Sequence, residues 1–435
     1  MNKLTVSDAW ETLIQKYDIK EEIRLNGIFN IKASEIKEIK EPRLMAKWDS
    51  SDQLPSSLKK NNINILPNSR SSYILGDFLL YQKLPELNEH IKNMPNVILP
   101  ELESLDVDNI SSEANAINVL QISGILEDFL ELDPDDKLYA TFNGRMSSGI
   151  FSFYVDTVRG IPRKIDVNKA QVEIDGGFES DDYLVILEAK NVLHKDFHIR
   201  QLYYPYRLWE TKVNKPIKLI FSIYTNKIFR LLEFAFTNKD DYSSIELIKS
   251  KNYSLEDTTI KMEDLQNVFS SIEQHNILSD NRNEFETPFI QADNFERIIS
   301  LLENMGESAM TGEEIEELMQ FSSRQRDYYY NAGKYLGIFE KYTDDNKRKY
   351  KLTKIGDQVL KQSYKERQLL LVKLILSHRI FYTLFSEMLE TGEPPTRSRI
   401  VELELEYNVC SKSVAKRRAS TVLGWFNWII KLPML

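Results

Sequence analysis

The pattern of apolar and polar positions divides the chain into three parts. In the first part, apolar residues spaced as on one helix face predict a helix over 7–17, and short alternating runs predict strands over 64–66 and 73–80. A proline-bounded segment at 95–100 then indicates a connector. We therefore expect residues 1–100 to form an N-terminal α+β domain.

The middle part alternates between helical and extended patterns. Its apolar run at 183–187 is typical of a buried strand, because no polar residue interrupts it. This order of elements predicts a mixed sheet flanked by helices, and we place the domain at residues 105–250. The other expected elements are helices over 113–130 and 196–212 and strands over 150–155, 171–174, 217–224 and 228–236.

After about residue 250 helical spacing dominates, and a helix is expected from Asn294. A winged helix-turn-helix module is predicted at residues 290–360, and a second helix-turn-helix-like module at residues 361–435. In the first module we expect helices over 312–319 and 324–336 and a β-wing over 341–351. The predicted fold class is thus an α+β multidomain protein.

Composition limits the classes of protein to consider. The 435 residues, of which 42% are hydrophobic, allow several buried cores. A single cysteine, Cys410, excludes an internal disulfide framework and a zinc site built from a cysteine cluster. There is no run of about 18 apolar residues and no apolar core of signal-peptide type near the start. We expect no membrane association and a cytoplasmic location.

The net charge of −10 argues mildly against nucleic acid as a partner, but binding depends on where the cations lie. Residues 321–351 contain eight Lys/Arg against four Asp/Glu, and residues 408–435 contain five Lys/Arg and no acid. Both basic segments lie in the C-terminal third. If the chain binds nucleic acid, that third is where local charge favours the contact.

The candidate chemistry lies in the middle part, at Asp175 and in the run Glu188-Ala189-Lys190. Alternate residues of a strand share a face, so Glu188 and Lys190 should project together while Ala189 turns into the core. We expect Asp175 to end the preceding strand, where two glycines let the chain turn sharply. If the two strands pair, both carboxylates and the ammonium group converge.

Such a set of groups suits metal-dependent hydrolysis of a phosphodiester. Two carboxylates supply the hard oxygen ligands that Mg²⁺ prefers, and the metal stabilises developing charge and lowers the pKa of a water. A nearby lysine can orient that water or offset negative charge. Taken alone, the pattern is more often that of a solvated ion pair at a strand end.

The surrounding sequence resembles the PD-(D/E)XK nuclease superfamily, in particular a group of type II restriction endonucleases. The likeness lies in Asp175, Glu188 and Lys190, in the runs 172–177 and 199–205, and in the order helix, three strands, helix, strand over about 110–225. Isoleucine stands at position 174, where the motif is named for proline.

The resemblance implies a restriction-endonuclease-like core in which Asp175 and Glu188 bind Mg²⁺, with Mn²⁺ as a substitute. It further implies that Lys190 orients the attacking water and that Gln201, on the following helix, positions the lysine or contacts a phosphate. The implied activity is site-specific hydrolysis of double-stranded DNA by a homodimer. A cognate DNA methyltransferase would be its genetic partner.

Two rival functions stay open. The first is a nuclease of the same fold that acts on modified or branched DNA in another defence or repair system. The second is a DNA-binding regulator built on the winged modules, with an inert nuclease fold. The intact set of Asp175, Glu188 and Lys190 argues against the regulator, because an inert fold has no need of all three.

The expected DNA contacts lie on the second helix and wing of the first module and on the last helix of the chain, where cations and amides of the types that contact bases and phosphates gather. A module that binds only protein is the alternative for both. The residues are Arg324, Gln325, Arg326, Tyr328, Asn331, Lys347, Arg348 and Lys349 in the first module, and Lys412, Lys416, Arg417 and Arg418 in the second.

His194 and His198 are four residues apart, a spacing that places both on one face of a helix and can bind zinc. Because no third ligand is evident, packing or contact with a DNA phosphate is the favoured interpretation.

Overall fold

A computed structural model describes residues 4–87, 90–94, 97, 99, 102–107, 110, 112–133, 135–284, 287–306 and 308–435. The connector expected at 95–100 lies for the most part outside them. The chain has an α+β architecture in which a mixed sheet is accompanied by several helices, as the sequence predicts at this coarse level. Among the described residues, no helix is both long and apolar enough to cross a membrane.

The N-terminal part packs two opening helices, α1 (Val6–Lys16) and α2 (Ile19–Asn26), against a small antiparallel sheet in the order β1-β3-β2. These strands are β1 (Ile28–Lys32), β2 (Asn64–Pro67) and β3 (Ser72–Gly76), and short helices α3 (Ala33–Lys37), α4 (Pro42–Ala46) and α5 (Ser56–Lys60) lie between them. The predicted helix over 7–17 and strand over 64–66 are confirmed. The strand expected over 73–80 ends early, since the ring of Phe78 closes over Gly76.

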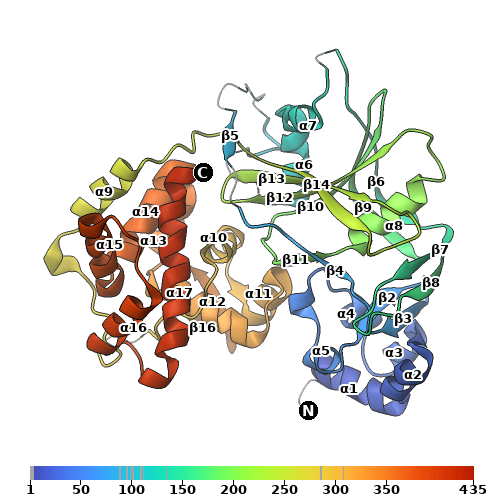
Figure 1. Ribbon diagram of the computed structural model, residues 1–435, viewed down its shortest axis with the longest axis horizontal. Helices are drawn as coiled ribbons and strands as arrows, with labels where there is room; N and C mark the ends of the chain where they lie inside the picture. Colours follow the sequence, from blue (N-terminus) through green and yellow to red (C-terminus); the bar gives the residue numbers. More distant parts are fainter. Residues whose placement is uncertain are drawn as a thin grey trace.

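The central sheet has seven strands in the order β5-β14-β13-β12-β10-β9-β6 (Figure 1). The pairs β10–β12 and β14–β5 are parallel and the others antiparallel, so the sheet is mixed. The strands are β5 (Ile91–Asn93), β6 (Tyr139–Ser147), β9 (Gln171–Glu179), β10 (Leu184–Lys190), β12 (Ile217–Thr225), β13 (Ile228–Phe236) and β14 (Ile245–Ser254).

Helices and a hairpin cover the two faces of this sheet. On one face lie α6 (Glu113–Ile122) and α7 (Ile125–Leu130). On the other lie α8 (Arg200–Trp209) and the hairpin of β7 (Ile150–Val155) and β8 (Arg163–Asn168), whose apolar residues form a second core. The single helix expected over 113–130 is wrong, because Gly124 adopts a left-handed conformation (φ 72°) and breaks it into two.

The helix expected over 196–212 is also wrong at its start. Asp196–His198 instead form a short strand, β11, paired with β4 (Tyr81–Lys83). The Asp196 carboxylate accepts hydrogen bonds from Ser50 Oγ (2.7 Å) and from Ser51 N (2.8 Å). These contacts hold the segment extended, and no periodicity within it could predict them.

The C-terminal part begins with α9 (Met262–Ser270), a helix that the sequence did not predict, and α10 (Phe295–Asn304), which the Asn294 side chain caps as expected. The winged arrangement is confirmed in α11 (Gly312–Met319), α12 (Ser323–Tyr335), β16 (Phe339–Asp344) and β17 (Lys347–Leu352). The turn between the two strands of the wing lies at Asp345 and Asn346, both of which have positive φ. Then follow α13 (Lys354–Lys361), α14 (Tyr364–Leu376), α15 (Arg379–Thr391), α16 (Arg397–Glu406) and α17 (Lys412–Lys431).

The three parts of the chain meet at the side chain of Asp52, in the short helix η1 (Ser51–Gln53) of the N-terminal part. Lys195 Nζ, beside the central sheet, lies 2.5 Å from one carboxylate oxygen, and Arg297 Nη1, on α10, lies 3.3 Å from the other. Burial would raise the pKa of Asp52, but the hydrogen bond and charge of Lys195 and the charge of Arg297 outweigh it and lower the pKa. The carboxylate is thus held ionised between two cations.

Replacing Asp52 with asparagine should lower the free energy of unfolding by about 2 kcal/mol, because two charge-assisted contacts are lost. A lowered pKa stabilises the fold fully above the unfolded value of about 3.9, and this contribution disappears as pH falls through the folded-state pKa. In urea unfolding, the gap between wild type and variant should therefore be constant from about pH 8 to pH 5 and shrink below about pH 4. The exposed Asp181, changed to asparagine, serves as control, and a gap that is equal for both variants would contradict this role.

Candidate functional site

The end of β10 places two charged side chains on one face of the central sheet. Leu184 and Ile186 pack in the core on the α8 side, whereas Val185, Leu187 and Ala189 pack in the core on the α6 side. By the alternation of a strand, Glu188 and Lys190 share the α8 side. The predicted burial of Ala189 is confirmed, since 1% of its surface is exposed.

Asp175 lies opposite this strand end, but not at a turn as expected. The strand β9 runs straight through Asp175 and the following two glycines, and its pairing with β10 ends at Gly176 and Leu187. At the next position Asp175 Oδ2 accepts a hydrogen bond from Ala189 N (3.0 Å). The Asp175 side chain thus replaces a backbone carbonyl as the hydrogen-bond acceptor where the two strands separate.

The glycine at 177 serves packing rather than a turn. A Cβ atom there would lie 2.3 Å from the ring of Phe142, which stacks on Trp209 of α8 with the ring centroids 4.0 Å apart. The Phe142 ring, on β6, can therefore lie across β9 only because Gly177 has no side chain. This close approach replaces the sharp turn that the sequence suggested.

Four predicted site residues converge at the strand end. Lys190 Nζ lies 2.6 Å from Glu188 Oε1, and Gln201 Nε2, from the first turn of α8, donates to the same oxygen at 2.5 Å. Asp175 is joined to them through the backbone of the intervening residue. The predicted convergence of Asp175, Glu188 and Lys190 is confirmed as geometry, and Gln201 joins it.

Two further carboxylates surround the lysine. Glu113, at the start of α6, has its Oε1 atom 3.7 Å from Lys190 Nζ. Asp49, in the loop after α4, belongs to the same cluster, since burial would raise its pKa but the charges of Lys190 and Arg200 lower it. The sequence did not assign Asp49 to the site, because its segment lies far along the chain from Asp175, Glu188 and Lys190.

Carboxyl groups outnumber ammonium groups around Lys190. Burial raises the pKa of Glu188 to about 8, with the charge of Lys190 opposing and that of Asp175 adding to the effect. For Lys190, burial would lower the pKa, but Glu188 and Glu113 outweigh it and raise the pKa, so the lysine is cationic. One ammonium group thus faces several carboxyl groups, an imbalance that a divalent cation would relieve.

The donor set fits Mg²⁺ better than a metal held wholly by protein. Among the described residues, no three His, Cys, Asp or Glu side chains come together as a metal site. Mg²⁺ is commonly bound by one or two carboxylates and keeps several waters or substrate phosphates. Asp175 and Glu188, which flank the point where β9 and β10 separate, supply that number.

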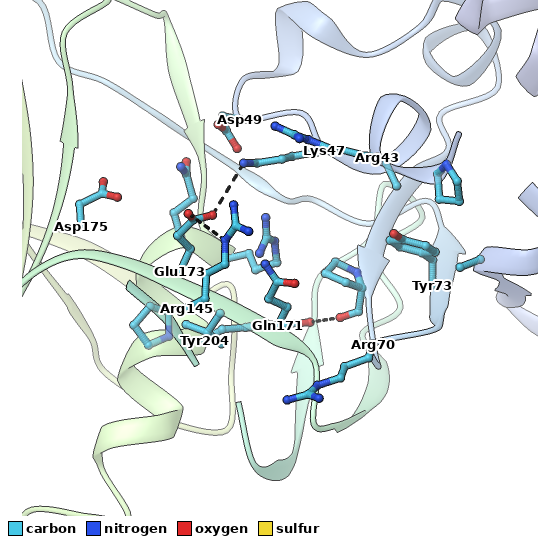
Figure 2. A pocket seen from close by; sticks show the side chains of 18 of the residues that line it. Arg43, Lys47, Asp49, Arg70, Tyr73, Arg145, Gln171, Glu173, Asp175 and Tyr204 are labelled. Carbon is cyan, nitrogen blue, oxygen red and sulfur yellow. Dashed lines mark hydrogen bonds and ion pairs between the residues drawn. The ribbon is translucent and has the colours of Figure 1, made fainter. Parts of the chain in front are cut away.

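A cavity of about 890 Å³ lies in front of the cluster. Figure 2 shows Glu173 joined to Lys47 of the N-terminal part and to Arg145 of β6, at 3.9 and 3.3 Å, with Asp175 further along the same strand. In contrast to the net charge of the chain, cations outnumber carboxylates in its lining. The seven cations are Lys37, Arg43, Lys47, Arg70, Arg145, Lys190 and Arg200, and the five carboxylates are Glu41, Asp49, Glu113, Glu173 and Asp175.

The two histidines do not form a pair on a helix. His194 lies in the connection between β10 and β11, and His198 in β11, where its Nδ1 accepts from Arg200 N (3.2 Å) and lies 3.2 Å from Tyr242 Oη. Burial lowers the pKa of both to about 3, so both are neutral. The zinc spacing is therefore coincidental.

The predicted DNA contacts divide into exposed and internally bonded side chains. Arg326 pairs with Glu316 (2.5 Å) and Asp327 (2.8 Å), and Arg418 is partly buried and donates to Ile290 O (3.3 Å). In the same way Gln325 Oε1 accepts a hydrogen bond from the backbone N–H of Ser322, the N-cap of α12, and Lys349 pairs with Asp344. Tyr328 and Asn331 are half-buried. The exposed candidates are Arg324, Lys347, Arg348, Lys412, Lys416 and Arg417.

Comparison with known families divides the chain into three matches, each to a domain of unknown function. DUF6996 matches residues 7–75, DUF6997 residues 76–254 and DUF7226 residues 297–434. The converging residues Asp175, Glu188, Lys190 and Gln201 all lie in the second match. No curated protein and no solved structure matches the chain.

Replacing Gly177 with alanine should destabilise the protein by about 1–3 kcal/mol, because the new methyl group overlaps the ring of Phe142. In thermal unfolding, the double variant that also carries Phe142→Leu should lose less than the sum of the two single variants. Additive losses would show that the close approach of ring and backbone does not constrain this edge of the sheet.

Proposed function

We propose that the chain is a Mg²⁺-dependent DNA endonuclease of the PD-(D/E)XK type, most simply a site-specific restriction endonuclease. The observation that carries the proposal is the convergence of Asp175, Glu188, Lys190 and Gln201 where two strands of a mixed sheet separate. Asp175, Lys190 and Gln201 line the cation-rich cavity, and Glu188 is buried beside Lys190. The family resemblance of these residues supports the same assignment.

In this proposal Asp175 and Glu188 hold the metal, which when bound supplies Lewis acidity toward the phosphate and makes a water easier to deprotonate. Lys190 orients the attacking water and offsets charge on the phosphate oxygens. Gln201 keeps the Glu188 carboxylate in place through its 2.5 Å hydrogen bond. The water oxygen bonds to phosphorus and gives up a proton to solvent, the bond to the leaving oxygen breaks, and that oxygen takes up a proton.

The cations of the cavity give the N-terminal part a role in this function. Arg43, Lys47 and Arg70, from the N-terminal part of the chain, line the same cavity as Asp175 and Lys190. A phosphodiester backbone is attracted to such a set of cations, and the contacts position the strand without reading its sequence. Two exposed basic surfaces, on the wing and on α17, would hold the flanking duplex.

Changing Asp175 or Glu188 to alanine should lower cleavage roughly a thousandfold or more, since metal stabilisation amounts to several kcal/mol. DNA binding in Ca²⁺ should persist, because neither residue contacts bases. The assay is digestion of unmodified phage DNA with Mg²⁺, with Glu179→Ala, at the far end of β9, as control.

Discrete fragments from the wild type indicate a site-specific enzyme that cuts both strands, which calls for a homodimer, visible by sedimentation. Cleavage only of modified or branched DNA would support the nuclease of another defence or repair system. Binding with no cleavage of any substrate would support the inert regulator. Near wild-type cleavage by either alanine variant would refute the assigned centre.

DNA affinity should depend on salt through these cations. Each phosphate contact adds about −0.9 to the slope of log affinity against log salt. Changing Arg43 and Arg70 together to glutamine should flatten this slope by about two units for any sequence, and neutralising 347–349 on the wing by two to three. Arg24→Gln, on α2 and outside the cavity, is the matched control. An unchanged slope in the first variant would mean that the N-terminal part does not touch the backbone.

A further inference from the structure

One wall of the catalytic cavity comes from the C-terminal part of the chain. Leu318 of α11 and Gln320, in the turn between α11 and α12, line the cavity together with His194. Gln320 and His194 are each 7% exposed. Among the described residues, neither Gln320 Oε1 nor His194 Nδ1 has a hydrogen-bond partner.

The turn that carries Gln320 is held in place. Its backbone has φ 55°, and Arg297 Nη2 donates to the carbonyl of the preceding Met319 at 3.1 Å. The Arg297 guanidinium also lies 4.5 Å from the ring centroid of Phe321, on the other side of Gln320. Arg297 thus contacts both neighbours of Gln320 and holds the backbone of the turn.

This wall is neutral, unlike the rest of the cavity. Burial and the charge of Arg297 keep the imidazole of His194 uncharged, and Gln320 has no charge at any pH. A buried polar atom without a partner is costly, so any bound group that hydrogen-bonds to it gains stability. An amide oxygen accepts hydrogen bonds, so the ligand that completes it must bring a donor.

In DNA that donor can come only from a base. The phosphodiester backbone has acceptor oxygens and no N–H group, and it is suited to the cationic side of the cavity. In the grooves, adenine and cytosine present an amino group on the major-groove edge and guanine on the minor-groove edge, whereas thymine presents none. A nucleotide with its phosphate at Lys190 would thus turn an amino-bearing edge to Gln320.

We propose that Gln320 and His194 form a subsite that hydrogen-bonds the amino-bearing edge of a base next to the cleaved phosphate. The inference rests on the proposed nuclease function and adds to it a base-recognising contact inside the cavity, supplied by the turn of the winged module rather than by its second helix. The preferred base at that position is adenine, cytosine or guanine, and thymine is disfavoured.

The test selects a pool of duplexes with a randomised segment, first for binding in Ca²⁺ and then for cleavage in Mg²⁺, and sequences the products. Gln320→Gly removes the amide and suits the positive φ, so its melting temperature should not fall. Gln320→Asn keeps an amide, so its base preference should lie between those of the wild type and Gln320→Gly. Gln358→Ala, on the exposed side of α13, is the control.

Wild type should disfavour thymine at one position about tenfold, as expected for one base contact, and the bias should vanish there alone in Gln320→Gly. His194→Phe should weaken the base preference at the same position.

If the wild type cleaves DNA and Gln320→Gly has the same base preference at every position, the subsite is refuted and the nuclease stands. If the wild type cleaves nothing but its binding shows a bias that Gln320→Gly loses, the subsite stands and the nuclease is refuted. A loss of preference at all positions together would assign Gln320 a structural role and refute the subsite.

Discussion

The arrangement of the whole molecule depends on one half-buried carboxylate held between two cations. Asp52 contacts Lys195 beside the central sheet and Arg297 on α10, so it joins all three parts of the chain. If any part moved away, a charged group would be left in a poorly solvated place without its partner. Arg297 also fixes the turn that carries Gln320. The cavity between the three parts therefore keeps its shape, and residues from distant segments face the same space.

Local periodicity accounts for what the sequence could predict. The strand β10, the wing and the capped helices follow from spacing within about ten residues, and so does the pairing of Glu188 with Lys190, two positions apart on one strand. What escaped prediction depends on distant partners. Asp196 is extended because Ser50 and Ser51 bind it, and Asp49 and Gln320 reach the cavity from segments far along the chain from β9 and β10. A glycine at position 124 is compatible with a helix break, but the helical spacing of the apolar residues on both sides favoured one continuous helix.

The distribution of charge explains how an acidic chain can present a surface suited to a polyanion. The net charge of −10 is spread over the molecule, whereas the cavity gathers seven cations from the N-terminal part, β6, β10 and α8. Around Lys190, in contrast, carboxyl groups outnumber cations. A negatively charged ligand is thus attracted at the rim, and a divalent cation at the centre. Both would be favoured most strongly when bound together.

The parallel pairing of β5 with β14 has a consequence for how the protein folds. Ile91 lies opposite Asn252, so one edge of the central sheet cannot close until nearly all of the sheet has been assembled. Contacts between such distant positions form late and slow the reaction, since a long loop must be ordered first. Until then β14 has an unpaired edge, the kind of surface on which chains associate wrongly. During synthesis the small N-terminal sheet can form early, while the central sheet remains open on this side.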